Sequence, residues 1–250
     1  MAAHVKPLIL HAHSSSPNPI KVAITLEALH IPYEVKKWDF GDDPEKGVKG
    51  TKFLKINENG RVPAIEDPNT GVVAWESGAC MNYIRRVYDK GNMIGPSGEL
   101  AQDLVDFEKW EYFLLTTLGP MTGQAIWFRK YNAEKNENAL ERYTAQTYRC
   151  YDVLEGQLKK TGAESILNGR VSAVDYHFEP WLHNYPLAGL SLDKYPLIKK
   201  WLGLMETREE EALHGLKLGL CIATGKVATP AANVRVEHAV SREHIISKLS

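Results

Sequence analysis

The stretch PLILHAHSSSPNPIKVAITLEALHIPYEVKKWDF, residues 7–40, decides the fold. Its first five residues, 7–11, form a short apolar run that ends at a cluster of serine, proline and asparagine, which is typical of a buried strand. Residues 20–30 carry apolar side chains at helical spacing, and residues 33–40 begin with alternating apolar and polar side chains. A helix between two strands predicts a βαβ unit with parallel strands and a right-handed crossover.

The following segments complete an α/β domain. Residues 51–56 predict a short helical turn, and residues 77–90 predict a helix. Between them, residues 61–67 and 71–77 are short apolar runs separated by the turn residues Pro-Asn-Thr, 68–70, which predicts a hairpin. The expected order is therefore β-α-β-loop-β-β-α.

Glycine and proline mark the end of this domain. The segment GNMIGPSG, residues 91–98, is the expected linker between an α/β domain at 1–90 and an all-helical domain at 99–221. Helical spacing in the second domain is found at residues 100–119, 136–160, 172–185 and 196–216. Pro120 is expected to kink or end the first of these helices. Residues 222–250 are weakly periodic and are expected to form a C-terminal tail.

The composition excludes several classes of function. The chain has 250 residues, 24% of them charged, with a formal net charge of −1, so no basic surface for nucleic acid is expected. No apolar run is long enough for a signal peptide or a membrane span, so no membrane association is expected. The three cysteines are widely spaced, and no cysteine or carboxylate stands at ligand spacing from His11 and His13, so we expect no bound metal and a cytoplasmic location.

One motif lies where the first strand meets its helix. Asparagine is a preferred N-cap and proline fits the first helical position, so Asn18-Pro19 predicts the helix start, with Asn18 as the cap. The same helix end, with the hydroxyls of residues 14–16, is also suited to bind an anion.

Three further motifs lie at the expected ends of strands and helices, and two of them allow a functional as well as a structural interpretation. Val62-Pro63 is either an edge-strand proline or a cis-proline that turns the preceding backbone toward a ligand. Glu76-Ser77 is either a helix start capped by Ser77, or a pair that holds the ammonium and carboxylate of a ligand. Residues 172–175, Ser-Ala-Val-Asp, have the spacing of a capping box and are interpreted as structural.

Taken together, these motifs resemble the glutathione transferases. The resemblance covers roughly residues 7–216 and is carried by four segments, SSSPNPIKV (14–22), NENGRVPAIED (57–67), WESGACMNYI (75–84) and NGRVSAVDYHFEPWL (168–182). It implies a thioredoxin-like α/β N-terminal domain followed by an all-α C-terminal domain. Three segments look most like the fungal and bacterial class related to the yeast nitrogen-catabolite regulator, namely SPNPIKV (16–22), GPMTGQAIWFRKY (119–131) and ALERYTAQTYRCYDVLEGQL (139–158).

The resemblance also implies a glutathione site. In that class the residue matching Asn18 lies near the glutathione sulfur, and Ser15 is the second candidate for this role. The residues expected to bind the rest of the tripeptide are Lys49, Arg61, Val62, Pro63, Glu76 and Ser77. Around Lys49 the sequence KGTKF departs from the usual pattern. The segment 112–128 is rich in large apolar side chains, and the residues expected to face an acceptor pocket there are Phe113, Met121, Gln124 and Trp127.

These expectations lead to two classes of function. The first is a glutathione S-transferase that uses glutathione as co-substrate to attack a hydrophobic electrophile, with a secondary-metabolite pathway as one setting. Glutathione-dependent isomerisation and the reduction of a disulfide or peroxide use the same activated sulfur and stay open. The second is a glutathione-binding regulatory protein. The regulator carries a long asparagine-rich segment ahead of the fold and this chain starts at the fold, which favours the enzyme. The resemblance further implies a homodimer.

Overall fold

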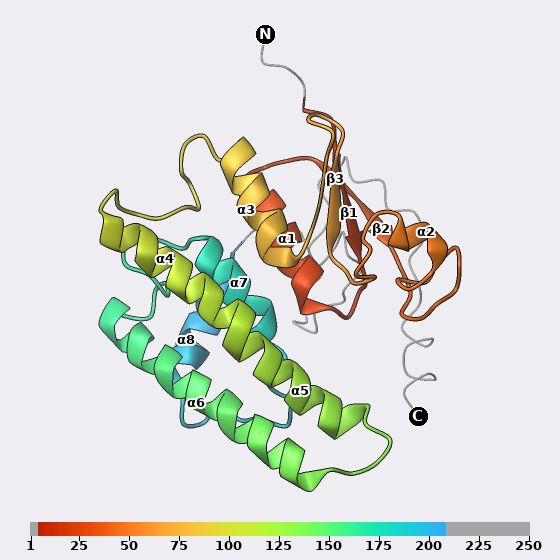
Figure 1. The fold of residues 1–250 in the computed structure, drawn as a ribbon. Helices are drawn as coiled ribbons and strands as arrows, with labels where there is room; N and C mark the ends of the chain where they lie inside the picture. Colours follow the sequence, from red (N-terminus) through yellow and green to blue (C-terminus); the bar gives the residue numbers. More distant parts are fainter. Residues whose placement is uncertain (1–4, 209–250) are drawn as a thin grey trace.

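The computed structural model describes residues 5–208 and shows an α/β domain packed against a group of helices (Figure 1). The sheet contains four strands, β1 (Leu8–Ala12), β2 (Tyr33–Lys37), β3 (Ala64–Asp67) and β4 (Val72–Trp75), in the order β2-β1-β3-β4. Strands β1 and β2 are parallel, and β3 is antiparallel to both β1 and β4. The predicted βαβ unit and hairpin are confirmed, and together they form a thioredoxin-like sheet.

Two helices separate the sheet from the second domain. Figure 1 shows α1 (Pro17–Ala28) and α3 (Ser77–Tyr88) between the strands and the helices of the second domain, with α2 (Thr51–Leu54) at the far side of the sheet. The core between β1 and α1 is fully buried, with Leu10 and Leu26 both 0% exposed. Burial of such side chains is the main favourable contribution to this packing.

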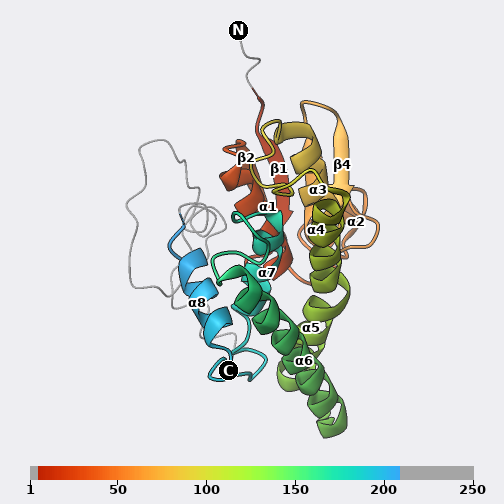
Figure 2. The same ribbon diagram turned by 90° about the vertical axis from the view of Figure 1, so that its left-hand side faces the viewer.

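The second domain is helical, as the spacing predicts. Its elements are α4 (Ala101–Phe113), the π-helical turn η1 (Leu114–Leu118), α5 (Gly119–Lys130), α6 (Glu137–Thr161), α7 (Ala173–Leu182) and α8 (Pro196–Met205). Figure 2 shows α5 and α6 extending away from the sheet side by side. Helix α7 packs on α1 and so joins the two domains.

The chain follows one helical path through Pro120. Helix α4 ends at Phe113, and a π-helical turn leads directly into α5, so α4 and α5 follow one line (Figure 1). Pro120 is the second residue of α5, where a missing backbone N–H is tolerated. The wider π turn changes the hydrogen-bond register just before it.

The predicted N-cap positions are wrong at two helices. In α1 the N-cap is Ser16, with extended backbone, and Asn18 is the second helical residue, because Pro17 also fits the first position and the helix starts one proline earlier. In α3 the cap position is Glu76, and Ser77 is the first helical residue. A single residue separates β4 from α3, and Glu76 makes this turn with φ 68°, a conformation that is uncommon outside glycine.

The predicted capping box at α7 is confirmed. The backbone N–H of Ser172 donates to Asp175 Oδ2 at 2.9 Å, and the N–H of Val174 donates to Ser172 Oγ at 3.3 Å. Asp175 is fully buried and also accepts from the backbone N–H of Ile166 and from Trp201 Nε1. One carboxylate therefore fixes the start of α7, the loop before it and helix α8.

The predicted tail at 222–250 and the end of the last predicted helix lie outside residues 5–208. Within those residues, no helix has both the length and the apolar character that crossing a membrane requires.

Candidate functional site

The sheet register brings four chain segments to one end of the sheet. Ala64, the first residue of β3, pairs with His11 of β1 and with Trp75 of β4, both antiparallel, while Ala12 pairs with Lys37 in the parallel ladder. The segments after β1, β2 and β4 and the segment before β3 therefore all leave the sheet at this end. The residues predicted for glutathione and its sulfur lie in these segments: Ser15, Asn18, Lys49, Arg61, Val62, Pro63, Glu76 and Ser77.

The Val62–Pro63 peptide bond is cis, as one of the two interpretations of this motif predicts. Val62 is 9% exposed and Ser77 is 3% exposed, whereas Glu76 is exposed to solvent. Because Ala64 pairs with Trp75, the cis peptide and the Glu76–Ser77 turn are neighbours at adjacent strand ends. An exposed carboxylate beside the start of a helix can interact with an ammonium group, while the helix start favours a carboxylate.

Two side-chain hydrogen bonds hold the loop before the cis peptide, residues 57–61. Asn57, 1% exposed, donates its Nδ2 to the Arg61 carbonyl at 2.6 Å. Lys49 donates its Nζ to the Asn59 carbonyl at 2.8 Å. A Cβ on Gly60, where φ is 61°, would lie 2.9 Å from Lys49 Cδ, so the loop and the lysine stem are in close contact. The structure thus places Lys49 against the loop that carries Arg61.

Asn18 contacts a residue from the other domain. Trp181, near the end of α7, donates its indole Nε1–H to Asn18 Oδ1 at 3.0 Å, across 163 positions of sequence. The indole N–H is a donor and never an acceptor, so the amide oxygen must face Trp181. Within residues 5–208, Asn18 Nδ2 makes no hydrogen bond. The sequence did not single out Trp181, because an apolar face of a helix gives no signal for such a contact.

Ser15 is engaged with His13. The backbone N–H of Ser15 lies 3.2 Å from His13 Nδ1, and Ser15 Oγ lies 2.9 Å from the same nitrogen. A ring nitrogen that accepts from an N–H carries no proton, so the Ser15 hydroxyl also donates to it. Burial lowers the pKa of His13, more than the nearby Asp39 raises it, so the ring is neutral near pH 7. The hydroxyl hydrogen is therefore directed at His13.

His11 has a structural role. Trp38 Nε1 donates to His11 Nδ1 at 2.9 Å, which leaves the proton on Nε2, and this nitrogen lies 2.8 Å from Glu66 Oε1. Burial lowers the pKa of His11, although Glu66 acts in the opposite direction. Both nitrogens are thus used in packing the sheet. Among residues 5–208, no group of three or more histidine, cysteine or acidic side chains is arranged to hold a metal ion.

The residues predicted for the acceptor pocket are not all brought together. Phe113 packs edge-on against Trp110, with ring centroids 5.5 Å apart, in the core between the domains. On α5, Trp127 is 49% exposed and follows Gly123 by one helical turn. Gly123 in turn faces the Trp181 ring, since a Cβ there would lie 3.5 Å from it. Trp127 therefore lies on the side of α5 where Gly123 faces Trp181, whose indole contacts Asn18. Gln124, three positions before Trp127, adjoins it on the helix surface. Met121, two positions before Gly123, points to nearly the opposite side of α5.

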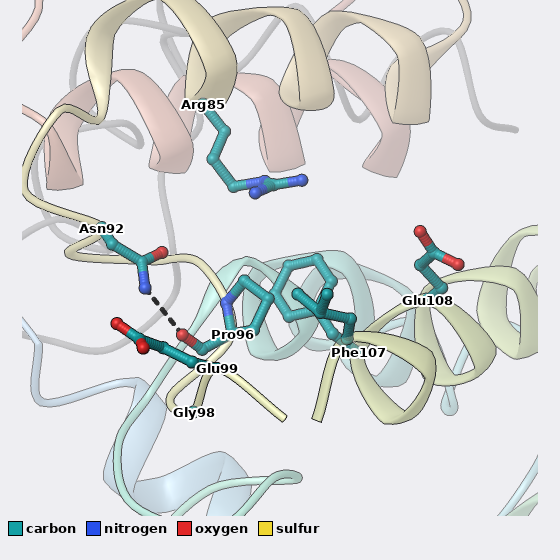
Figure 3. Close-up of a pocket in the computed structure, with 8 residues that line it drawn as sticks. Arg85, Asn92, Pro96, Gly98, Glu99, Phe107 and Glu108 are labelled. Carbon is teal, nitrogen blue, oxygen red and sulfur yellow. Dashed lines mark hydrogen bonds between the residues drawn. The ribbon is translucent and has the colours of Figure 1, made fainter. Parts of the chain in front are cut away.

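A separate pocket lies at the other end of α3. Its volume is about 420 Å³, and Figure 3 shows Arg85 of α3 reaching toward Phe107 of α4, with the guanidinium carbon 5.1 Å from the ring centroid. Its lining residues are Arg85, Asn92, Pro96, Gly98, Glu99, Leu104, Phe107 and Glu108. Arg85 follows Ser77 by eight positions on one helix, a rise of about 12 Å. This pocket is not part of the sheet-end site.

Comparison with known proteins identifies the family. The sequence model of the glutathione S-transferase N-terminal domain matches residues 6–86, and that of the C-terminal domain matches residues 118–209. The glutathione S-transferase-like protein tpcF of Aspergillus fumigatus is 35% identical over 216 residues, covering 82% of this chain and 92% of that protein. The chain belongs to the glutathione S-transferase family. Protein URE2 of Debaryomyces hansenii is 29% identical, over 80% of this chain and 74% of its own length.

Solved structures of the family agree with this assignment. The glutathione transferase URE2P6 from Phanerochaete chrysosporium, in complex with oxidized glutathione, has a TM-score of 0.77 and 32% identity, covering 85% of this chain and 96% of its own. A glutathione transferase homologue from Lodderomyces elongisporus, with two glutathione molecules per subunit, has a TM-score of 0.77 and 28% identity, covering 84% and 98%. The thioredoxin-like domain with an all-helical second domain is thus the transferase architecture.

Proposed function

We propose that this protein binds glutathione at the sheet end and stabilises its thiolate for attack on a hydrophobic electrophile. The observation that carries the proposal is the Asn18 amide, which lies in the first turn of α1 with its oxygen held by Trp181 and its Nδ2 available. The cis Val62–Pro63 peptide and the Glu76–Ser77 turn, at neighbouring strand ends, would receive the cysteinyl backbone and the γ-glutamyl end. Lys49 and Arg61 would make further polar contacts with the tripeptide.

The start of α1 alone does not supply enough free energy to lower the glutathione thiol pKa by about two units, so the Asn18 amide is needed as well. A free thiol has a pKa near 8.5, so lowering it by about two units needs roughly 2.7 kcal/mol of preference for the thiolate. A helix start supplies about 0.3–1 kcal/mol, and about 2 when partly buried. Here the prolines at 17 and 19 remove two backbone N–H donors from the first turn, so this helix end is a weaker anion site than usual. A hydrogen bond to an ion adds about 1.5–3 kcal/mol, which the Asn18 amide can provide.

The sulfur must come from the co-substrate. Cys80 is 0% exposed, and burial raises the pKa of its thiol to about 12. Burial also raises the pKa of Cys150. Within residues 5–208 the cysteines are therefore poor nucleophiles, because the thiolate is the reactive form. Neither Asn18 nor Ser15 can accept a proton at neutral pH, so the glutathione proton would pass to solvent.

The electrophile would bind between Asn18 and α5, where the half-exposed Trp127 offers an apolar surface. Gln124 and Met121 of the same helix are further candidates for contact with it. Phe113 would act mainly through packing. Conjugation, isomerisation and reduction of a disulfide or peroxide would all use this thiolate. A secondary-metabolite pathway is one proposed setting for the reaction. We further propose a cytoplasmic homodimer, which sedimentation would test.

Glutathione binding and turnover test the proposal. Calorimetric titration should show binding of glutathione, and ultraviolet titration should show a bound thiol pKa below that of free glutathione. Conjugation of a generic aryl halide and reduction of a model disulfide would then separate the reactions. Binding with no turnover in either assay would favour the second candidate, a glutathione-binding regulator, which the similarity to the nitrogen regulation fragment of the yeast prion protein Ure2p supports. Absence of glutathione binding would overturn the sheet-end site.

A further inference from the structure

We propose that Trp181 is a positioning residue for the thiolate site: its indole N–H holds the Asn18 amide in the orientation that presents Nδ2 to the glutathione sulfur. The inference rests on the proposed function, because it concerns the same sulfur. It adds a contribution of the helical domain to a step otherwise assigned to the thioredoxin-like domain.

The chemistry of the two groups sets the orientation. A carboxamide has an accepting side and a donating side, and rotation by a half turn exchanges them. With Nδ2 toward a thiolate the amide stabilises the charge, whereas with the oxygen toward it two negative ends face each other. Since an indole N–H can only donate, its 3.0 Å contact with Asn18 Oδ1 selects the first arrangement.

Trp181 is itself held on both sides. Its ring lies along α5, where a Cβ on Gly119 or Gly123 would approach it to 3.4 and 3.5 Å. Helix α7, which carries it, is fixed at its start by the buried Asp175 and packs on α1, which carries Asn18. The indole therefore acts from a rigid support, as precise positioning of a catalytic group requires.

The test compares Trp181→Phe, Asn18→Ala and the double variant. Phenylalanine keeps an aromatic ring over the two glycines and removes the N–H donor. The bound glutathione thiol, followed by ultraviolet titration, should gain about 0.5–1 pKa unit in Trp181→Phe, less than in Asn18→Ala. In the Asn18→Ala background the Trp181→Phe change should add nothing, since no amide is left to orient. Glutathione affinity at a pH below the thiol pKa should change less than twofold.

A spectroscopic readout separates positioning from packing. In protein with ¹⁵N-labelled tryptophan, the six tryptophans give indole N–H signals, and the signal lost in Trp181→Phe should also shift in Asn18→Ala. Asn18→Asp keeps an acceptor for Trp181 but has no donor, so that signal should stay hydrogen-bonded while the thiol pKa rises.

The outcomes are distinct. A wild-type thiol pKa equal to that of free glutathione overturns the proposed function and this inference with it. A lowered wild-type pKa that Trp181→Phe leaves unchanged overturns the inference alone. Additive shifts in the double variant also overturn it, because they show that Trp181 acts through packing and not through the amide.

Discussion

His177 Nε2 lies 3.0 Å from Glu111 Oε1, and both side chains are buried where the two domains meet. Asn82 donates to the same carboxylate oxygen at 2.7 Å, and the Lys21 ammonium lies nearby with no hydrogen-bond partner among residues 5–208. Lys21, Asn82, Glu111 and His177, here called the interdomain polar cluster, come from α1, α3, α4 and α7. Four helices thus share a set of polar side chains where the two domains meet.

The cluster makes folding sensitive to mild acid. Burial lowers the pKa of His177 to about 4, against the opposing effect of Glu111, whereas the unfolded value is near 6.5. The folded state then binds fewer protons than the unfolded state between these two values. The contribution of His177 to the free energy of unfolding is therefore fully present above pH 6.5 and is lost as the pH falls through 4, with a total loss of about 3 kcal/mol. In His177→Gln the unfolding free energy, measured by urea denaturation from pH 7.5 to 4.5, should fall less steeply than in wild type.

His183 provides a control of opposite sign. Burial acts to lower its pKa, but Glu179 at 2.7 Å and Glu206 at 3.6 Å raise it overall. A raised pKa stabilises the fold below about pH 6.5, and this contribution is lost as the pH rises through the folded value. His183→Gln should therefore destabilise at pH 5.5 and have little effect at pH 8.5. Parallel pH profiles for the His177 and His183 variants would contradict the assignment.

Lys21 should weaken the fold while it is protonated. It is 0% exposed, and burial lowers its pKa to about 7, although Glu111, Glu76 and Cys80 favour the charged form. Below pH 7 the ammonium is charged in both states and its burial cost is fully present; between pH 7 and 10.5 that cost is progressively relieved. Lys21→Met should raise the unfolding free energy by about 1–3 kcal/mol at pH 6 and by less at pH 9.

Lys37, exposed on β2, offers the matched control, since Lys37→Met should change the unfolding free energy at neither pH. A lower stability of Lys21→Met at pH 6, measured by thermal melts, would mean that the ammonium is paired more strongly than its burial suggests.

Local patterns predicted the fold because they act over a few residues. The alternation in β2, the helical spacing of α6 and the capping box at Ser172 each reflect contacts between near neighbours in sequence. The helix starts were less predictable, because Pro17 and Pro19 satisfy the same rule and the sequence does not rank them.

The site was predictable where it depends on the backbone and unpredictable where it depends on packing between domains. The cis Val62–Pro63 bond is one of the two interpretations that the motif allows, and the convergence at the sheet end follows from the strand order. Trp181 contacts Asn18 across 163 positions of sequence. Lys21 is buried, but its position in the helix sequence is one that an exposed lysine also occupies. The contact between Trp181 and Asn18 and the burial of Lys21 both depend on the packing of α7 on α1, so no local sequence pattern predicts them.

The buried carboxylate of Asp175 should be a large contribution to stability. It accepts from the N–H groups of Ile166 and Ser172 and from Trp201 Nε1, so Asp175→Ala leaves three buried donors without a partner. The unfolding free energy should fall by about 3 kcal/mol or more, against about 1 for Ser172→Ala. Asp193→Ala, at an exposed position, should stay within about 0.5 kcal/mol of wild type in urea denaturation.

Asn18 and Ser15 compete for the role of thiolate donor, and the hydrogen bonds favour Asn18. The Ser15 hydroxyl donates to His13 Nδ1 at 2.9 Å, while Asn18 Nδ2 has no partner among the described residues. Asn18→Ala should raise the pKa of bound glutathione by about one to two units, the value of one hydrogen bond to an ion. Ser15→Ala should shift it by less than about 0.3 unit. Ultraviolet titration of the thiolate measures both; a shift in Ser15→Ala with none in Asn18→Ala would reverse the assignment and require the hydroxyl to turn from His13 toward the sulfur.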